Sequence, residues 1–211
     1  MLLAPITALR ERLNVANKPA YNRVLTDLLL NTTLGIETHL DTKFARGKRI
    51  DKFFAGSNNY LVTGAPGKSN ASPGVLYLLL SGLNASDLSL SIGASMGGSG
   101  SSISPSNYHL EDRGIVSLHD GWMQDDYITA TYTGGYETED VEDMPVYQGV
   151  PTVLKQAVLM FSEHVYMSKY GDSQLDDSLP DGEDYTDPPN AVIQILHQYN
   201  RNGPHALRSL L

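Results

Sequence analysis

The fold of this chain is decided by two segments that lie close together in its sequence. They read DDYITATYTGGYETED (Asp125–Asp140) and, after a short link, VPTVLKQAVLMFSEHVYMSKY (Val150–Tyr170). In the first segment Tyr and Thr alternate with Ile, Ala and Tyr, and this period of two predicts a β-strand over 126–133. In the second, a leading proline and apolar residues spaced by four, three and four predict an amphipathic helix. We therefore expect a strand, a Gly-Gly-Tyr turn, an acidic loop and a helix, in that order.

The composition limits the kinds of protein that this chain can be. Its 211 residues suffice for one domain with a core, or for a core with a sizeable insertion. The absence of cysteine excludes disulfides, thiolate nucleophiles and Cys-based metal sites. The first residues lack a basic region followed by a long apolar one, and no window approaches the ~18 apolar residues of a membrane span. We expect a protein that is made and used in a cytoplasm and does not associate with a membrane.

Helical periodicity occurs near both ends of the chain. Ile6, Leu9 and Leu13 share one face of a short predicted helix. A longer apolar stripe predicts a second helix over 20–40, and a last short helix is expected over 191–199. The two ends should therefore contribute to a small helical bundle.

The middle of the chain is predicted to be rich in β-strands. An Asp-Arg-Gly hairpin turn at 112–114 separates two of them. Two loops, Gly64–Gly74 and Gly93–Ser106, interrupt this region, and the second is a low-complexity stretch that is not expected to pack a core. The predicted strands span 49–54, 75–81, 88–92, 108–111, 114–119 and 126–133.

No catalytic, cofactor or metal site is predicted. Gly64–Ser69 (GAPGKS) resembles half a phosphate-binding loop, but Val62 stands where the first glycine of that motif is required. The six histidines include no pair at helical i, i+4 spacing, and His119-Asp120 has no G-x-S-x-G elbow to supply a serine. The carboxylates of 172–187 lack the frame of a calcium-binding EF-hand loop. A small hydrolase is the least supported function.

The net charge of −9 is unevenly distributed. From Glu137 to Asp187 there are 13 acidic residues against two basic ones, and such a surface repels phosphate. A short basic cluster lies earlier in the chain, where a solvated loop or a subunit contact is favoured over phosphate binding. That cluster consists of Lys43, Arg46, Lys48, Arg49 and Lys52.

The order of these elements resembles a known family. A helical segment (Leu28–Phe44) precedes a β region with the pattern Y-x-L-x-x-x-G-x-V-x-L at 108–118. An aromatic-Thr-Gly-Gly-Tyr strand end (Tyr132–Tyr136), a proline-led helix (Pro151–Tyr166) and a short helix ending in Tyr-Asn-Arg at 199–201 follow. Over residues 21–201 this order resembles the head–tail connector (adaptor, or head-completion) proteins of tailed double-stranded DNA bacteriophages. The loops here are longer than the compact insertion of that family, and the last helix ends on a less basic pattern.

The resemblance implies a virion protein that is assembled in the host bacterial cytoplasm. Connector proteins form a ring, usually of twelve copies, beneath the portal protein. The ring extends the DNA channel and presents a surface to the next tail-side protein. DNA passes through without specific binding, and no cofactor is involved. Another neck or tail-completion protein is the alternative; a β-rich adhesin would show repeats and little helix.

An acidic channel is physically compatible with this role. Twelve copies at −9 would carry about −108, and every phosphate contact in a channel would add affinity and friction. Some carboxylates of 172–187 or of the segment 137–143 are therefore expected to face the channel. In that second segment they are Glu137, Glu139, Asp140, Glu142 and Asp143.

The predicted fold class is α+β, a helical bundle with a β-rich insertion. We expect a single connector domain, with helical parts at 1–45 and 150–201, the insertion at 46–136 and a tail at 202–211. The tail ends in ALRSLL, an unusual sequence to leave in water. We expect its Leu207, Arg208, Leu210 and Leu211 to contact the portal or a neighbouring subunit.

Overall fold

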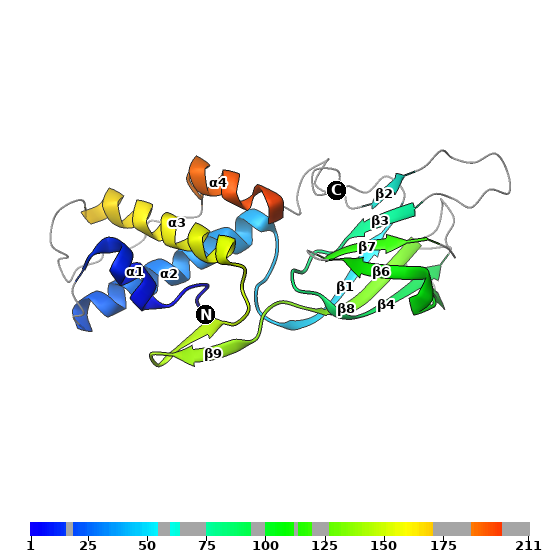
Figure 1. Cartoon of the computed structure of the whole chain (residues 1–211), viewed down its shortest axis with the longest axis horizontal. Coiled ribbons are helices and arrows are strands. Elements are labelled where there is room, and N and C mark those ends of the chain that lie inside the picture. Colours follow the sequence, from blue (N-terminus) through cyan, green and yellow to red (C-terminus); the bar gives the residue numbers. More distant parts are fainter. Residues whose placement is uncertain are drawn as a thin grey trace. The chain divides into compact units, whose positions relative to one another are not determined.

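The chain divides into two compact units, one helical and one built from strands (Figure 1). Met1–Leu40 and Tyr136–Gln198 form the helical unit, and Asp41–Gly135 lie in the β unit. The α+β class is as predicted, and none of the described helices is long and apolar enough to cross a membrane. The computed structural model describes residues 1–15, 19–54, 60–63, 75–93, 100–111, 114–119, 127–170 and 187–199.

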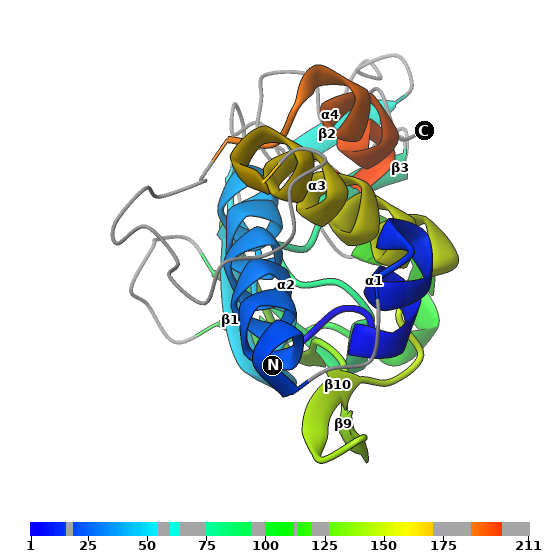
Figure 2. The ribbon, with the colours of Figure 1, turned by 90° about the vertical axis from the view of Figure 1, so that its left-hand side faces the viewer.

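The helical unit is organised around one central helix. This is α3 (Thr152–Tyr170), which contacts α1 (Ile6–Leu13), α2 (Pro19–Leu40) and α4 (Asn190–Leu196) (Figure 2). The last of these continues as a 3-10 turn to Tyr199. The apolar stripe that predicted α3 is buried, and it consists of Leu154, Val158, Phe161 and Val165.

A buried hydroxyl pair joins α2 and α3. The Oγ1 of Thr32 lies 2.7 Å from the Oγ of Ser162, and both side chains are completely buried. Thr32 also donates to the carbonyl of Leu28 at 2.8 Å, so Ser162 is the donor to Thr32. Each hydroxyl is small enough to let the two helices approach closely.

The helical unit also contains an acidic hairpin, which precedes α3 in the sequence. It consists of β9 (Thr138–Val141) and β10 (Met144–Tyr147), and it replaces the acidic loop expected over 137–143. Leu2 lies along the other side of β10, where its N–H donates to Pro145 and its carbonyl accepts from Tyr147, at 3.0 and 2.9 Å. The N-terminus thereby fastens the hairpin to the helical unit.

The β unit contains two antiparallel sheets of four strands each. The first has the order β1-β8-β4-β5, and the second the order β2-β3-β7-β6. The first sheet comprises β1 (Gly47–Phe53), β8 (Tyr127–Gly134), β4 (Ser86–Gly93) and β5 (Ser101–Ser102). The second comprises β2 (Tyr60–Thr63), β3 (Val75–Leu79), β7 (Ile115–Leu118) and β6 (Tyr108–Glu111), which a 3-10 turn (Pro105–Asn107) precedes.

One apolar core is shared by the two sheets. Strand β8 alternates as its sequence predicts, with Ile128, Ala130 and Tyr132 buried and the intervening threonines more exposed. Because strand side chains alternate between faces, these residues meet the inward side chains of the second sheet. That sheet contributes Leu76, Leu78, Val116 and Leu118 to the same cluster.

Most strand positions agree with the sequence predictions. Strand β6 has the predicted bounds, and the other five predicted strands differ from the observed ones by one or two residues at an end. Glu111 pairs with Ile115, so the predicted hairpin between β6 and β7 is confirmed. Strands β2, β5, β9 and β10 were not predicted. Of the two predicted loops, residues 64–74 and 94–99 lie outside the described residues. The rest of the second loop was wrongly expected to pack no core, because its Ile103 is buried in the cluster that the two sheets share.

Candidate interaction surfaces

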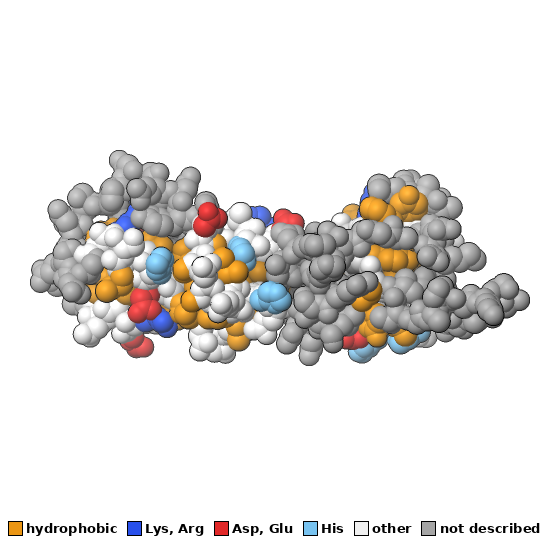
Figure 3. Space-filling model, turned by 90° about the horizontal axis from the view of Figure 1, so that it is seen from above, with side chains coloured by type: hydrophobic (Ala, Val, Ile, Leu, Met, Phe, Trp, Pro, Cys, Tyr) orange, Lys and Arg blue, Asp and Glu red, His pale blue; other side chains and the backbone are white. Residues whose placement is uncertain are grey.

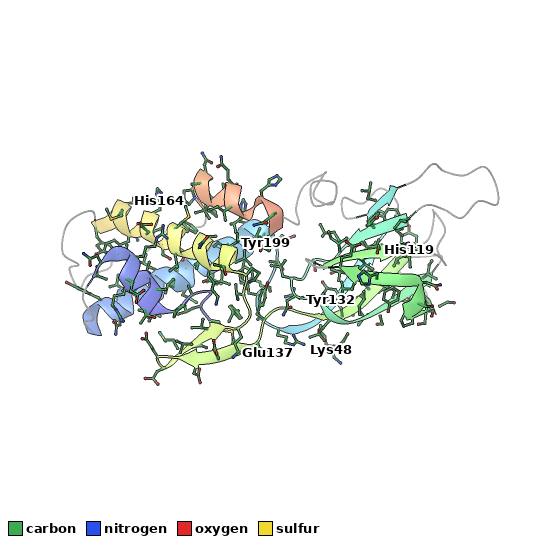
Figure 4. All side chains as sticks on the ribbon, in the orientation of Figure 1. Lys48, His119, Tyr132, Glu137, His164 and Tyr199 are labelled. Atoms are coloured by element: carbon green, nitrogen blue, oxygen red, sulfur yellow. The ribbon has the colours of Figure 1, made fainter. Side chains whose placement is uncertain are left out.

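The histidines considered for catalysis are divided between the two units of the described chain. Among those residues no three His, Asp or Glu side chains could hold a metal ion together. His119 belongs to the β unit and His164 to α3 of the helical unit (Figure 4). Asp120 and the phosphate-loop-like Gly64–Ser69 lie outside the described residues.

The acidic hairpin carries the first candidate surface. Its turn residues Glu142 and Asp143 have φ values of 53° and 64°, which is the left-handed geometry of a type I′ turn. All five carboxylates predicted to face a channel are exposed on this hairpin or directly before it: Glu137, Glu139, Asp140, Glu142 and Asp143. Glu139 accepts a hydrogen bond from the Gln148 side-chain amide at 2.7 Å. The sequence did not predict the strands that carry these carboxylates, and their position in a channel stays a prediction.

The basic cluster forms the second candidate surface, on and before strand β1. Lys48 and Lys52 project from the outer face of the first sheet, and Figure 4 labels Lys48 on this strand. Arg49 turns back along the chain and donates to the carbonyl of Lys43 at 2.6 Å. Arg46 donates to the Ser86 hydroxyl at 3.2 Å. Strand β1 thus carries Lys48, Arg49 and Lys52, whereas Lys43 and Arg46 lie in the segment before it.

An apolar side chain stands between the two lysines of β1. Ile50 is 65% exposed, the largest exposed fraction among the large hydrophobic residues that the structure describes. It pairs with Thr131 of β8, whose outer face consists of threonines and Tyr127. The ring of Tyr127 lies 6.1 Å from that of Phe54, centroid to centroid. Sequence reasoning missed Ile50, because an apolar residue in a strand is normally assigned to the core.

A partly buried polar network joins β1 to the loop after β3. Asp51 accepts three hydrogen bonds: from the Ser81 N–H at 2.6 Å, the Ser81 hydroxyl at 2.7 Å and the Tyr132 hydroxyl at 2.8 Å. The Tyr132 oxygen accepts in turn from the Gly82 N–H at 2.7 Å. Burial, together with the nearby Asp51 charge, raises the pKa of Tyr132 from 10.0 to about 12. The tyrosine therefore remains a neutral structural group at neutral pH.

The buried tyrosines of the helical unit are also held neutral. Burial raises the pKa of Tyr147, and the charge of Glu37 adds to this effect. Burial likewise raises the pKa of Tyr166 and of Tyr170, whose rings lie 5.3 Å apart. These hydroxyls are less ready to ionise than free tyrosine, so none of them is prepared as a base near neutral pH.

The surface around α3 and α4 has no dominant charge. Figure 3 shows hydrophobic and histidine side chains there among isolated acidic and basic groups. Two predicted contact segments lie outside the described residues: the acidic stretch up to residue 186, and the tail with Leu207, Arg208, Leu210 and Leu211. Their expected contacts stay predictions.

No protein-family model and no curated protein matches this chain. It is similar to a chain in a solved structure described as "Virion of native gene transfer agent (GTA) particle". The identity is 11%, the TM-score is 0.44, and the match covers 95% of this chain and 91% of that one. A second similar chain comes from "Neck of empty GTA particle computed with C6 symmetry", at 12% identity, with the same TM-score and coverage. At these values the function has to be argued from the residues of this chain.

Proposed function

We propose that this protein is a structural component of the head–tail neck of a tailed phage or phage-like particle. It forms a ring beneath the portal, joins the DNA-filled head to the tail and extends the DNA channel. The observation that carries this proposal is the course of the chain. Helices α1 and α2 come first, a β unit is inserted at residues 41–135, and the hairpin, α3 and α4 complete the helical unit. This is the order of elements in which the sequence resembles head–tail connector proteins.

The exposed acidic hairpin gives the proposed channel a physical basis. Duplex DNA carries one negative charge per about 1.7 Å of its axis, and it binds surfaces whose cations displace its counterions. The hairpin offers carboxylates at Glu139, Asp140, Glu142 and Asp143, and its described residues include no lysine or arginine. A ring lined by such hairpins would repel the phosphates and let DNA slide.

The proposed partners are the portal, a tail-side neck protein and further copies of this chain, twelve in the family pattern. We assign the portal contact to the tail that contains Leu207, Leu210 and Leu211, because its apolar residues need cover from water. Deleting residues 203–211 should abolish co-assembly with the portal and leave the monomer folded. If the truncated protein binds the portal as well as the full chain does, the tail has no such role.

Native mass spectrometry and electron microscopy of the purified protein test the function directly. The protein would be studied alone and together with the portal protein encoded in the same genome. A ring, or a ring that forms only on the portal, is the expected result. A stable monomer without affinity for the portal would refute the connector function. Binding to a tail component alone would favour the alternative, another neck or tail-completion protein.

A further inference from the structure

We propose that neighbouring copies join through two strand edges: the outer edge of β9 in one copy pairs with the outer edge of β1 in the next. This contact deepens the proposed function, because it rests on the assembly of a ring. The partner at both edges is a second copy of this chain. The two surfaces come from different compact units, so each copy can bind one neighbour with its hairpin and another with its β unit.

The first edge belongs to the acidic hairpin. On β10, the carbonyl of Pro145 and the N–H of Tyr147 point away from β9, and each forms a hydrogen bond with the backbone of Leu2. Their register partners on β9 are Asp140 and Thr138. In an antiparallel pair, opposite residues of this type both point outward. Asp140 and Thr138 therefore direct their N–H and C=O groups to an edge with no strand partner in the described part of the chain.

The second edge belongs to β1, the first strand in the order β1-β8-β4-β5. Within the described residues no strand pairs with its other side. This strand has seven residues, Gly47–Phe53, and can accommodate the four residues of β9. An unpaired edge of this length is a template for another strand, which folded proteins normally protect. Next to this edge stands the exposed Ile50, which an added strand would partly cover.

The charges of the two edges are opposite. The hairpin carries Asp140 and its neighbouring carboxylates. On β1, the exposed Lys48 and Lys52 stand on either side of Ile50. Opposite charges on adjacent strands stabilise the pairing, and like charges oppose it. Pairing of two β9 edges or of two β1 edges is thus disfavoured, while β9 with β1 is favoured. Such unlike, head-to-tail contacts are the kind that generate rings.

Charge reversal and its rescue test this contact in the full-length chain. Asp140→Lys on β9 and Lys48→Glu on β1 should each raise the protein concentration needed for half-assembly by about tenfold, because attraction becomes repulsion. The double variant Asp140→Lys with Lys48→Glu should return to within about threefold of the original protein. The matched controls Glu11→Lys and Arg23→Glu change the same charges at exposed positions on α1 and α2, and should leave assembly unchanged.

A backbone probe separates strand pairing from simple charge attraction. Asp140→Pro removes the outward N–H while the bonds inside the hairpin remain, since proline is accepted on the free side of an edge strand. It should weaken assembly more than Asp140→Asn, which removes the charge and keeps the N–H. Circular dichroism of the monomers would confirm that each variant is folded.

The outcomes distinguish this contact from the proposed function. If the original protein forms rings and all the variants form them equally well, the edge contact is wrong and the ring stands. If the double variant does not recover although both single variants fold, the two edges do not meet. If reversal lowers the thermal stability of the monomer and leaves assembly unchanged, the edges pair within one chain instead. If the original protein forms no ring even with the portal, both proposals fall.

Discussion

Tyr132→Phe should lower the free energy of unfolding of the β unit by about 2–3 kcal/mol at neutral pH. The substitution keeps the buried ring and removes only a hydroxyl that accepts from the Gly82 N–H and donates to Asp51, at 2.7 and 2.8 Å. Leaving a buried N–H without its partner costs about 1–3 kcal/mol, and a hydrogen bond to a charged group contributes about 1.5–3 kcal/mol. The two terms overlap because they involve a single oxygen, so we expect less than their sum.

The same hydroxyl gives this variant a pH signature. The pKa of Tyr132 is raised from 10.0 to about 12 in the folded protein, so its stabilising effect is complete below pH 10 and is lost as the pH rises towards 12. At about pH 11 the original protein should have lost about 1.4 kcal/mol through this group. Tyr132→Phe cannot lose it, so the difference between the two proteins should shrink by that amount. The other tyrosines with raised pKa values ionise in both proteins and cancel.

Urea unfolding at about pH 8 and about pH 11, followed by circular dichroism and by the fluorescence of the single tryptophan, measures both effects. Tyr77→Phe is the matched control, because it removes a hydroxyl from a partly exposed position on β3. A difference of less than about 0.5 kcal/mol at pH 8 would refute the network as a stabilising element. A difference that stays constant between the two pH values would refute the assigned pKa.

Four further variants test other parts of the fold. Gly135→Ala should destabilise the protein by more than about 2 kcal/mol in urea unfolding, since φ is +100° and a Cβ would lie 2.3 Å from a backbone carbonyl oxygen. Gly149→Ala, at φ +65° with open space around it, should cost about 1 kcal/mol, and equal effects would contradict this reasoning. Ser162→Ala should cost about 1 kcal/mol through its hydrogen bond to α2, whereas a neutral result would mean that this bond contributes nothing. Replacing Glu142 by Asn and Asp143 by Gly should raise the thermal midpoint, because these residues suit left-handed turn positions, and a lower midpoint would argue against the type I′ geometry.

The elements that the sequence predicted well are those whose own side chains carry the pattern. One face of β8 and one face of α3 pack against the cores of their units. Because burial favours apolar residues on those faces, the hydrophobic period is visible in the sequence. The Gly-Gly-Tyr strand end was also recognisable. Gly135 adopts a positive φ and approaches Ala45 so closely that a side chain cannot fit.

The hairpin could not be predicted because its sequence opposes the usual strand signals. Acidic residues are depleted in strands, and Pro145 removes a donor that a central strand would need. Its turn uses Glu142 and Asp143 at positions where Asn or Gly is normal. What stabilises it is distant in sequence: Leu2, whose backbone pairs with β10. A single sequence shows no local trace of such a contact.

The polar network could not be predicted for a related reason. It also explains how the chain segments that enter and leave the β unit are held together. Asp51 and Tyr132 are 81 residues apart, and both bind the loop that follows β3. The same loop holds the two chain segments that border the β unit. On the incoming side, the Thr42 hydroxyl donates to Ser81 at 2.8 Å. On the outgoing side, the Gly135 N–H donates to Leu83 at 2.7 Å.

The incoming and outgoing segments are thus held side by side by bonds that lie wholly within the β unit. Breaking the network at Asp51 should loosen both segments together, because the loop that binds them would lose its anchor on β1. Hydrogen exchange at Ser81 and Gly135 would then rise in parallel in Asp51→Asn, and the shared β-sheet core would remain protected. Faster exchange at only one of these two sites would show that the two segments are held independently.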